Sequence, residues 1–130
     1  MRVLVVDDEI EIGEVLVTAL NGAGLDAMSV SNGSDAVRSI TTRGADVVVV
    51  DMHMPGMDGL EFIQRLRRLR PRTRILGISG GDPRSDIDLL KISGRLGAHA
   101  TLKKPFKASQ VVQKVKELGG ALADSETSKS

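Results

Sequence analysis

An unbroken apolar run that ends in a carboxylate constrains the fold of this chain more than any other feature. Residues Val47–Val50 are four consecutive valines, and Asp51 follows them directly. Four β-branched residues without polar alternation predict a parallel strand that is buried on both faces. Pro55, Gly56 and Gly59 then turn the chain away from this strand. The run therefore predicts that Asp51 lies at the carboxyl edge of a sheet, where open α/β folds bind ligands.

Short apolar strands alternate with helical patterns along the rest of the chain. The other predicted strands are Arg2–Val6, Asp26–Val30, Arg74–Ile78 and His99–Lys103. Five segments have apolar residues at helical spacing, which predicts one inward face for each. In the first three helices these residues are Ile12, Val15, Leu16, Ala19 and Leu20; Ala36, Val37 and Ile40, within residues 34–42; and Phe62, Ile63, Leu66 and Leu69. In the last two they are Ile87 and Leu90, in a helix that runs to Leu96, and Val111, Val112, Val115 and Leu118. Five strands that alternate with five helices predict an α/β fold, a parallel sheet with helices on both faces.

The strand order follows from chemistry rather than from periodicity. Asp7 and Asp8 can converge with Asp51 only if the first and third strands are neighbours, which favours the flavodoxin-like, doubly wound order 2-1-3-4-5. The chain has 130 residues and 41% apolar content, which suits one domain with one core. We expect this domain to span residues 1–119, with a flexible tail at residues 120–130, since two glycines precede a Ser/Thr/Lys-containing end.

Composition excludes several classes of protein. The chain has no cysteine, which excludes disulfides and thiolate metal sites and favours a cytoplasmic protein. The run Val3–Val6 is too short for a signal peptide or a membrane span, so no membrane insertion is expected. A net charge of +1 and only two aromatic residues also argue against direct nucleic-acid binding.

Polar residues with complementary chemistry fall at the carboxyl ends of four predicted strands. Asp7 and Asp8 follow the first strand, Asp51 ends the third, Ser79 follows the fourth and Lys104 follows the fifth. Clustered carboxylates repel one another unless they bind a cation, and Mg²⁺ suits such a site because it takes one or two carboxylates and leaves positions for phosphate oxygens. Each residue alone has a plain structural explanation in capping, turns or solvation. Together they predict a single site.

The same residues and their surrounding motifs resemble the receiver domain of bacterial response regulators over about Arg2 to Leu118. That family has an acidic pair after the first strand, a phosphoacceptor aspartate before a Met-Pro-Gly-x-Asp-Gly loop, a Ser or Thr after the fourth strand and Lys-Pro after the fifth. This chain has Met54-Pro55-Gly56-Met57-Asp58-Gly59 and Lys104-Pro105 at the matching places. In the family the peptide before this proline is usually cis.

The resemblance implies a phosphorylation-dependent signalling switch of a two-component or phosphorelay system rather than an enzyme acting on other molecules. Its partners would be a sensor histidine kinase or a histidine phosphotransfer protein upstream and a protein target downstream. Asp51 would accept the phosphoryl group. Lys104 would neutralise the phosphoryl oxygens and Ser79 would hydrogen-bond them. The neighbouring Lys103 is interpreted as a surface charge.

The resemblance also implies a set of Mg²⁺ ligands. Asp8 would bind the ion directly and Asp7 mainly through water. Asp51 and the backbone carbonyl of His53 would complete the set of protein ligands.

Three other classes of function are alternatives to a phosphorylated switch. A flavodoxin-like cofactor binder is disfavoured, because Asp7-Asp8-Glu9 would repel a phosphate after the first strand. A haloacid-dehalogenase-like phosphatase would need an Asp-x-Asp pattern that is absent here. A receiver-like interaction module that is not phosphorylated is the principal alternative. The arginines at 65, 67, 68, 70, 72 and 74 are interpreted as a solvated face near a helix C-terminus, in preference to a site for an acidic partner.

The readout of phosphorylation is expected to depart from the family pattern. Many receivers carry Tyr or Phe three residues before the conserved lysine, whereas this chain has Thr101 there. A threonine cannot move a comparable apolar area, so an aromatic switch is not expected. The sequence Gly80-Gly81-Asp82-Pro83 and the helix predicted after it are expected to carry the signal instead, since glycine permits large backbone changes.

Overall fold

The chain folds around one five-stranded parallel sheet. The structure is a computed structural model that describes residues 1–80, 95 and 97–127. The strands are β1 (Arg2–Val6), β2 (Asp26–Val30), β3 (Val47–Asp51), β4 (Arg74–Ser79) and β5 (Ala100–Lys103). Their order is β2-β1-β3-β4-β5 and every neighbouring pair is parallel. The predicted α/β, flavodoxin-like order is therefore confirmed, with β2 at one edge.

The register of the strands aligns their carboxyl ends. Val6 pairs with Val50 across β1 and β3, and Ser79 pairs with Lys103 across β4 and β5. Because parallel strands end at the same edge, the residues that follow β1, β3, β4 and β5 are brought to one side of the sheet. This register is what positions the candidate site.

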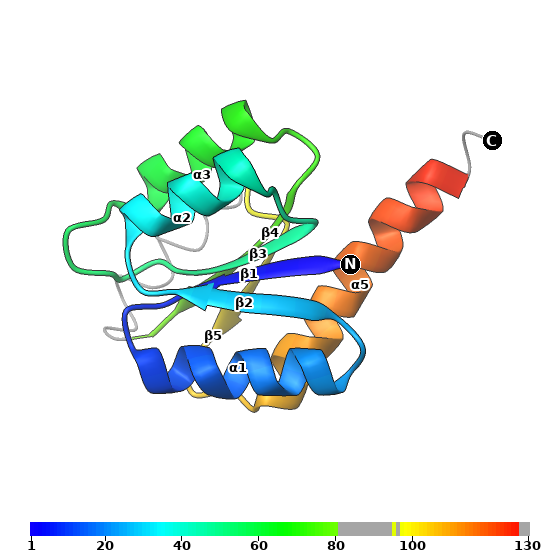
Figure 1. Cartoon of the computed structure of the whole chain (residues 1–130), viewed down its shortest axis with the longest axis horizontal. Helices are drawn as coiled ribbons and strands as arrows, with labels where there is room; N and C mark the ends of the chain where they lie inside the picture. The colour runs from blue at the N-terminus through cyan, green and yellow to red at the C-terminus, as the bar shows by residue number, and fades with distance from the viewer. Residues whose placement is uncertain (81–94, 96, 128–130) are drawn as a thin grey trace.

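Helices cover both faces of the sheet, as Figure 1 shows. The described helices are α1 (Ile10–Gly22), α2 (Gly33–Thr42), α3 (Gly59–Leu69) and α5 (Ala108–Thr127). In the figure α1 and α5 lie on one face, and α2 and α3 lie on the other. The helix predicted between Asp82 and Leu96 lies outside the described residues, apart from Arg95.

The side chains of the central strand divide between two buried clusters. Val48 and Val50 pack with α2 and α3, in a cluster that includes Ile40 and Ile63. Val47 and Val49 pack with α1 and α5 in the second cluster. All four valines are 0–1% exposed, because successive side chains of a strand point to opposite faces and both faces are covered.

Local signals in the sequence set the ends of two helices. The Asp58 side chain accepts hydrogen bonds from the backbone N–H groups of Leu60 and Glu61, as expected of the N-cap of α3. Asn32 caps α2 in the same way, through the N–H of Asp35. None of the helices among the described residues is sufficiently long and apolar to span a membrane.

Two residues expected on inward helix faces are exposed instead. Val15 is 58% exposed, because α1 approaches the sheet through Gly13, where a Cβ would lie 3.2 Å from Cβ of Ser29. This close approach rotates the buried face of α1 toward Gly13, Leu16 and Leu20 and leaves Val15 in solvent. Leu69 is 43% exposed because it lies in the last turn of α3 and lines an open cavity.

The last helix is longer than predicted. Leu118 is the last inward residue that the sequence predicts and the tail is expected from residue 120, whereas α5 continues through Gly119 and Gly120 to Thr127. Each glycine costs about 1 kcal/mol in a helix, a cost that residues with good helix propensity such as Ala, Leu and Glu can offset when they follow. The boundary expected at residue 120 therefore falls inside a helix.

Candidate functional site

The carboxyl edge of the sheet brings together the polar residues that the sequence singled out. Asp7 follows β1, Asp51 ends β3, Ser79 ends β4 and Lys104 follows β5. The side chains of Asp7, Asp51 and Ser79 are buried, with residue exposures of 3%, 4% and 0%. Buried polar groups are costly unless they are satisfied, so their concentration at one edge indicates a site that binds something polar.

Three carboxylates are close enough to share one cation. Asp7, Asp8 and Asp51 each offer an oxygen, and these oxygens all lie within 4.8 Å of one another. Mg²⁺ binds oxygen at about 2.0–2.1 Å, so two ligands on opposite sides of the ion are about 4.2 Å apart. The cluster therefore fits Mg²⁺ after a small adjustment or with a bridging water. Asp8 is exposed whereas the other two are buried, which leaves the site open on one side.

Backbone N–H groups fix the orientation of the two buried carboxylates. The N–H of Glu9 donates to Oδ1 of Asp7, and the N–H of His53 donates to Oδ1 of Asp51, each at 2.9 Å. The donor lies two residues after the carboxylate that it binds, and the loop turns farther on, where Gly56 adopts a φ of 71° that favours glycine. The carboxylates are thus held in place before any ligand binds.

Among the described residues, Lys104 contacts the carboxylates of Asp51, Asp7 and Glu9. Its Nζ lies 3.1 Å from Oδ2 of Asp51, within hydrogen-bond distance, and 3.8 Å from both Oδ2 of Asp7 and Oε1 of Glu9. Burial disfavours the ammonium, but the hydrogen bond and charge of Asp51, helped by the other two acids, outweigh burial and raise the pKa of Lys104. The ammonium therefore stays protonated beside the carboxylates.

The Lys104-Pro105 peptide bond is cis, in agreement with the expectation from the family resemblance. Lys103, one residue earlier, is exposed and paired with Ser79 through the backbone ladder. The interpretation of Lys104 as the site lysine and Lys103 as a surface charge therefore agrees with where the two side chains lie.

Asp7 carries a buried charge that the fold compensates only in part. Its Oδ2 is buried and has no hydrogen-bond partner among the described residues. Burial raises the pKa of Asp7, against the lowering effects of the Glu9 N–H and of Lys104, and the negative charges of Asp51 and Glu9 add to the increase. A bound cation would supply the missing compensation.

The hydroxyl of Ser79 has no hydrogen-bond partner among the described residues. Its Oγ is buried and makes no hydrogen bond within the described part of the chain, although its backbone carbonyl accepts from the N–H of Lys104 at 2.7 Å. An unsatisfied hydroxyl beside an ammonium and a carboxylate cluster is a group available to an anionic ligand.

Glu9 is a part of the site that the sequence analysis missed. In the sequence Glu9 is only the third acid after the first strand, whereas the structure places its carboxylate 3.8 Å from Nζ of Lys104. Only a spatial neighbour 95 positions away in the chain could have revealed this contact. The carbonyl of His53, expected as a metal ligand, stays a prediction.

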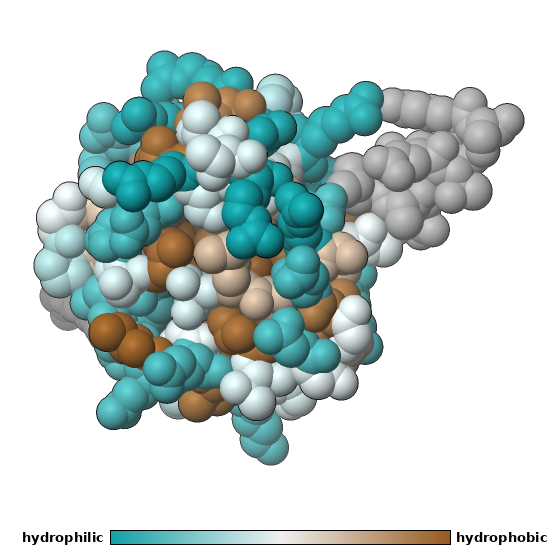
Figure 2. All heavy atoms as spheres, viewed as in Figure 1, coloured by the Kyte–Doolittle hydropathy of each residue, from teal (hydrophilic) through white to brown (hydrophobic). Residues whose placement is uncertain are grey.

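A mostly apolar cavity of about 670 Å³ adjoins the site. Its walls include Ile12, Val15 and Leu16 of α1 and the segment Lys104-Pro105-Phe106. Ile10, at the start of α1, is 63% exposed. Figure 2 shows apolar side chains interspersed with polar ones on the visible face, which includes α1. The carboxylate site is therefore bordered by surface that an apolar partner face could cover.

The arrangement suits transfer of a phosphoryl group to a carboxylate. A phosphoryl group next to Asp51 would meet the ammonium of Lys104, the hydroxyl of Ser79 and a cation held by the acids. Positioning and charge neutralisation are most of what phosphoryl transfer requires of a protein.

Comparisons with known proteins agree with this geometry. The family model described as the response regulator receiver domain matches residues 3–116. The DNA-binding transcriptional regulator NtrC of Escherichia coli K12 is 34% identical over 110 residues, which cover 85% of this chain and 23% of NtrC. This chain therefore spans less than a quarter of the length of that relative.

A second relative is similar to this chain in length. Sporulation initiation phosphotransferase F of Bacillus subtilis is 29% identical over 116 residues, which cover 89% of this chain and 91% of that protein. Among solved structures, the receiver domain of NtrX from Brucella abortus superposes with a TM-score of 0.83 and 26% identity, covering 91% of this chain and 98% of that one.

Proposed function

The chain belongs to the response regulator receiver domain family, and from this premise we propose that it is a signalling switch phosphorylated on Asp51. The observation that carries the proposal is the hydrogen bond of 3.1 Å between Nζ of Lys104 and Oδ2 of Asp51, inside a cluster of carboxylates. The phosphoryl donor is a phosphohistidine of a sensor histidine kinase or of a histidine phosphotransfer protein. The proposed location is cytoplasmic, where such partners present their phosphohistidine.

The proposed reaction is a displacement at phosphorus. A carboxylate oxygen of Asp51 attacks the phosphorus, an O–P bond forms and the N–P bond of phosphohistidine breaks. The electron pair of that bond stays on the imidazole nitrogen, which becomes protonated from solvent. The product on Asp51 is an acyl phosphate.

Asp7, Asp8, Asp51 and the carbonyl of His53 are the groups that would hold Mg²⁺. The bound ion would neutralise negative charge that accumulates on the phosphoryl oxygens. Lys104 supplies a second positive charge, and its side chain, 24% exposed, can move from Asp51 to the phosphoryl group. The buried Oγ of Ser79 donates a hydrogen bond to the same group, which satisfies its own hydrogen-bonding capacity.

We propose that the donor protein docks over the apolar cavity beside the site. A donor histidine must reach Asp51, so its surroundings cover the nearby surface of α1 and Pro105. Val15 and Ile10 are exposed there, at 58% and 63%, and would be buried by such a partner. Val15→Lys should therefore weaken phosphorylation by a protein donor while leaving phosphorylation by a small acyl phosphate unchanged.

The downstream step is contact with a protein target. Thr101 occupies the place of the family's aromatic switch residue, and it lies on β5 opposite Gly77. We therefore keep the segment from Ser79 to Leu90 as the proposed carrier of the signal, most of which lies outside the described residues. Amide exchange with and without a phosphoryl mimic, in Mg²⁺, should show its largest changes there. Changes confined to Asp51 and its loop would contradict this readout.

Intact-mass measurement tests the central proposal. After incubation with Mg²⁺ and a small acyl phosphate, the wild type should gain the mass of one phosphoryl group. Asp51→Asn should gain none, and Asp8→Asn or chelation of Mg²⁺ should suppress labelling. Asp58→Asn is the matched control, because Asp58 caps α3 outside the carboxylate cluster and its variant should still be labelled. Undiminished labelling of Asp51→Asn would refute the assignment.

The same experiment separates the alternative functions. A receiver-like interaction module without phosphorylation would show no labelling under any of these conditions. A phosphatase would release inorganic phosphate from added substrates at many turnovers per protein molecule. The switch should consume the small donor only as fast as its own acyl phosphate hydrolyses.

A further inference from the structure

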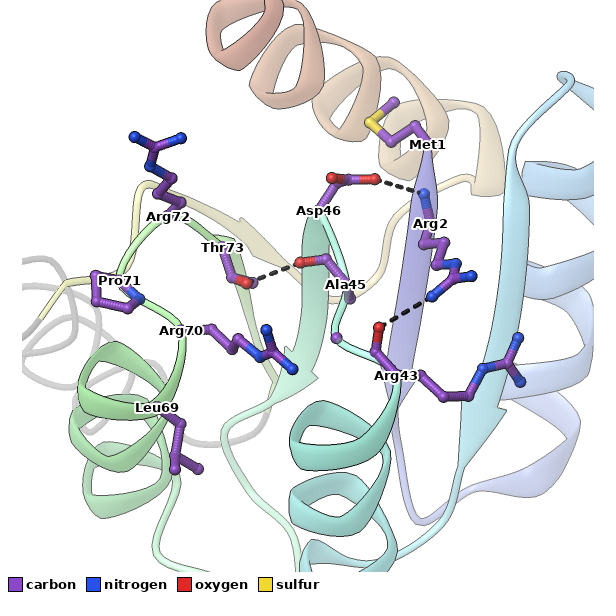
Figure 3. A pocket seen from close by; sticks show the side chains of 11 residues that line it. Met1, Arg2, Arg43, Ala45, Asp46, Leu69, Arg70, Pro71, Arg72 and Thr73 are labelled. Carbon is purple, nitrogen blue, oxygen red and sulfur yellow. Dashed lines mark hydrogen bonds between the residues drawn. The ribbon is translucent and has the colours of Figure 1, made fainter.

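A second cavity lies at the amino edge of the sheet, away from the carboxylate site. It has a volume of about 710 Å³ and is bounded by the start of β1, by the connection from α2 to β3 and by the connection from α3 to β4. Figure 3 shows this cavity and the side chains around it. Volumes of about 300–1,000 Å³ are typical of sites for small molecules.

Arginine dominates the charged side chains of this cavity. Its lining includes Arg2, Arg43, Arg70 and Arg72 and one acidic residue, Asp46. Four positive charges and one negative charge leave a local excess of three. The whole chain has a net charge of only +1, and its clustered acids lie at the opposite edge of the sheet, so this excess is a local feature.

Two of the arginines are fixed in place by the protein backbone. Arg70 donates from Nε to the carbonyl of Ile40 and from Nη2 to that of Thr41, at 3.2 and 3.3 Å. Arg2 donates from Nη1 to the carbonyl of Arg43 at 2.9 Å. A guanidinium has five N–H donors, so both side chains are held in position and still have donors to offer a ligand. Preorganisation of this kind reduces the entropy lost on binding.

Capping of α2 explains only part of this arginine cluster. Arg70 satisfies carbonyls at the C-terminal end of α2, where cations are favourable. Asp46 already accepts from the backbone N–H of Arg2 at 2.7 Å, and no described salt bridge involves an arginine. Arg72 makes no hydrogen bond or ion pair within the part of the chain that the structure describes. Arg72 lines the cavity, and in Figure 3 its guanidinium extends away from that of Arg70, so its donors are not taken up by the described residues.

We propose that this cavity binds a small polyanion that carries two or more phosphate or carboxylate groups. The arginine fork matches the geometry of both groups, and each charge-assisted pair is among the stronger hydrogen bonds in proteins. The cavity is concave and limited in volume, which favours a small molecule over an extended acidic segment of a protein. The site lies at the opposite edge of the sheet from Asp51 and is independent of its phosphorylation.

Titration of the ¹⁵N-labelled protein with inorganic tripolyphosphate and, separately, with citrate tests this proposal. Metal-free buffer with a chelator prevents either probe from bridging to the carboxylates through Mg²⁺. At least one probe should saturate with a Kd below about 1 mM, which corresponds to about 4 kcal/mol. Amide shifts should centre on Arg2, Gly44, Asp46 and Thr73, and the affinity should fall as salt is added.

Removal of single arginines localises the binding. Arg72→Ala should weaken the better probe about tenfold, and it removes no described contact, so its unfolding midpoint should match the wild type. Arg38→Ala is the matched control, an exposed arginine of α2 that does not line the cavity, and it should bind as the wild type does. Binding of tripolyphosphate alone identifies phosphate as the ligand group, and binding of citrate alone identifies carboxylate.

Three results would overturn the proposal. The first is an absence of saturation by either probe. The second is a set of shifts confined to the edge of the sheet that carries Ser79 and Lys104. The third is equal weakening by Arg72→Ala and Arg38→Ala, which would show general attraction to a positive surface. Binding of a poly-glutamate peptide without binding of either small probe would assign the cavity to an acidic protein segment and would also reject the proposal.

Discussion

Replacing Asp7 by asparagine should stabilise the metal-free protein and abolish its stabilisation by Mg²⁺. Asp7 is 3% exposed, and its Oδ2 has no hydrogen-bond partner among the described residues. Asparagine keeps the shape of the side chain and the acceptor that the N–H of Glu9 uses. It removes a buried negative charge that lies beside Asp51 and Glu9. It also removes a favourable contact of 3.8 Å with Lys104.

The direction of the effect follows from the pKa of Asp7. Burial raises this pKa above its usual value of 3.8, even with Lys104 nearby, so the charged form is disfavoured in the folded state. An unsatisfied buried polar atom costs about 1–3 kcal/mol. Because the amide is also incompletely paired, we expect a net gain on the order of 1 kcal/mol in the free energy of unfolding. For a chain of this size that gain corresponds to about 3–4 °C in Tm.

The pH dependence of this gain has a defined sign. An acid with a raised pKa in the folded state binds more protons when folded, so the wild type recovers stability as pH falls. The difference between Asp7→Asn and the wild type should therefore be greatest near neutral pH. It should shrink as the pH falls below the raised pKa of Asp7 and disappear near the ordinary value of 3.8.

Thermal and urea unfolding with and without Mg²⁺ provide the assay. At ten times its Kd, Mg²⁺ should stabilise the wild type by about 1.4 kcal/mol. Asp7→Asn should be more stable than the wild type in chelator and should gain little from Mg²⁺. Asp8→Asn is the matched control, because Asp8 is exposed and its variant should lose the Mg²⁺ effect without gaining stability in chelator. A less stable Asp7→Asn in chelator would refute the reasoning about buried charge.

Three further predictions concern single contacts. Thr73→Val should lower the free energy of unfolding by about 1–2 kcal/mol in urea titrations, because the buried Oγ1 of Thr73 donates to the carbonyl of Ala45 at 2.7 Å. Asp58→Ala should cost about 1 kcal/mol by the same measurement, since it removes the cap of α3. Burial and nearby arginines lower the pKa of His99. Its contribution to stability should therefore be complete above about pH 6.5 and should decrease as the pH falls. In unfolding midpoints measured across pH 5–8, His99→Gln should reduce this dependence of stability on pH.

The fold could be predicted largely because its strands are buried on both faces. The valines before Asp51 have no polar alternation, and only a central parallel strand accommodates such a run. Helix faces were less predictable. The exposure of Val15 depends on how closely α1 approaches the sheet at Gly13, which is a tertiary contact with Ser29. Periodicity reports that a helix has an apolar face but does not fix its rotation on the sheet to within one residue.

Most residues of the candidate site could also be predicted from the sequence, but the contacts between their charged groups could not. Parallel strands necessarily bring Asp7, Asp51 and Lys104 to one edge once the strand order is known. The contact of Glu9 with Lys104 depends on side-chain conformations across 95 positions of sequence. The arginine cluster shows the same limit, since the sequence favoured a solvated face and did not reveal that Arg70 bonds to carbonyls of α2.

The contacts of Lys104 with three acids affect how the proposed switch can accept a phosphoryl group. Both oxygens of Asp51 are engaged at rest, because Oδ1 accepts from the N–H of His53 and Oδ2 accepts from Lys104. One ammonium is shared among three acids, so its departure from Asp51 would leave buried carboxylates uncompensated. A cation bound by the acids would remove that penalty and would free Lys104 to contact an incoming phosphoryl group. The Mg²⁺ dependence that we propose for phosphorylation would therefore have a second cause in the resting charge balance, besides the chemistry of phosphorus.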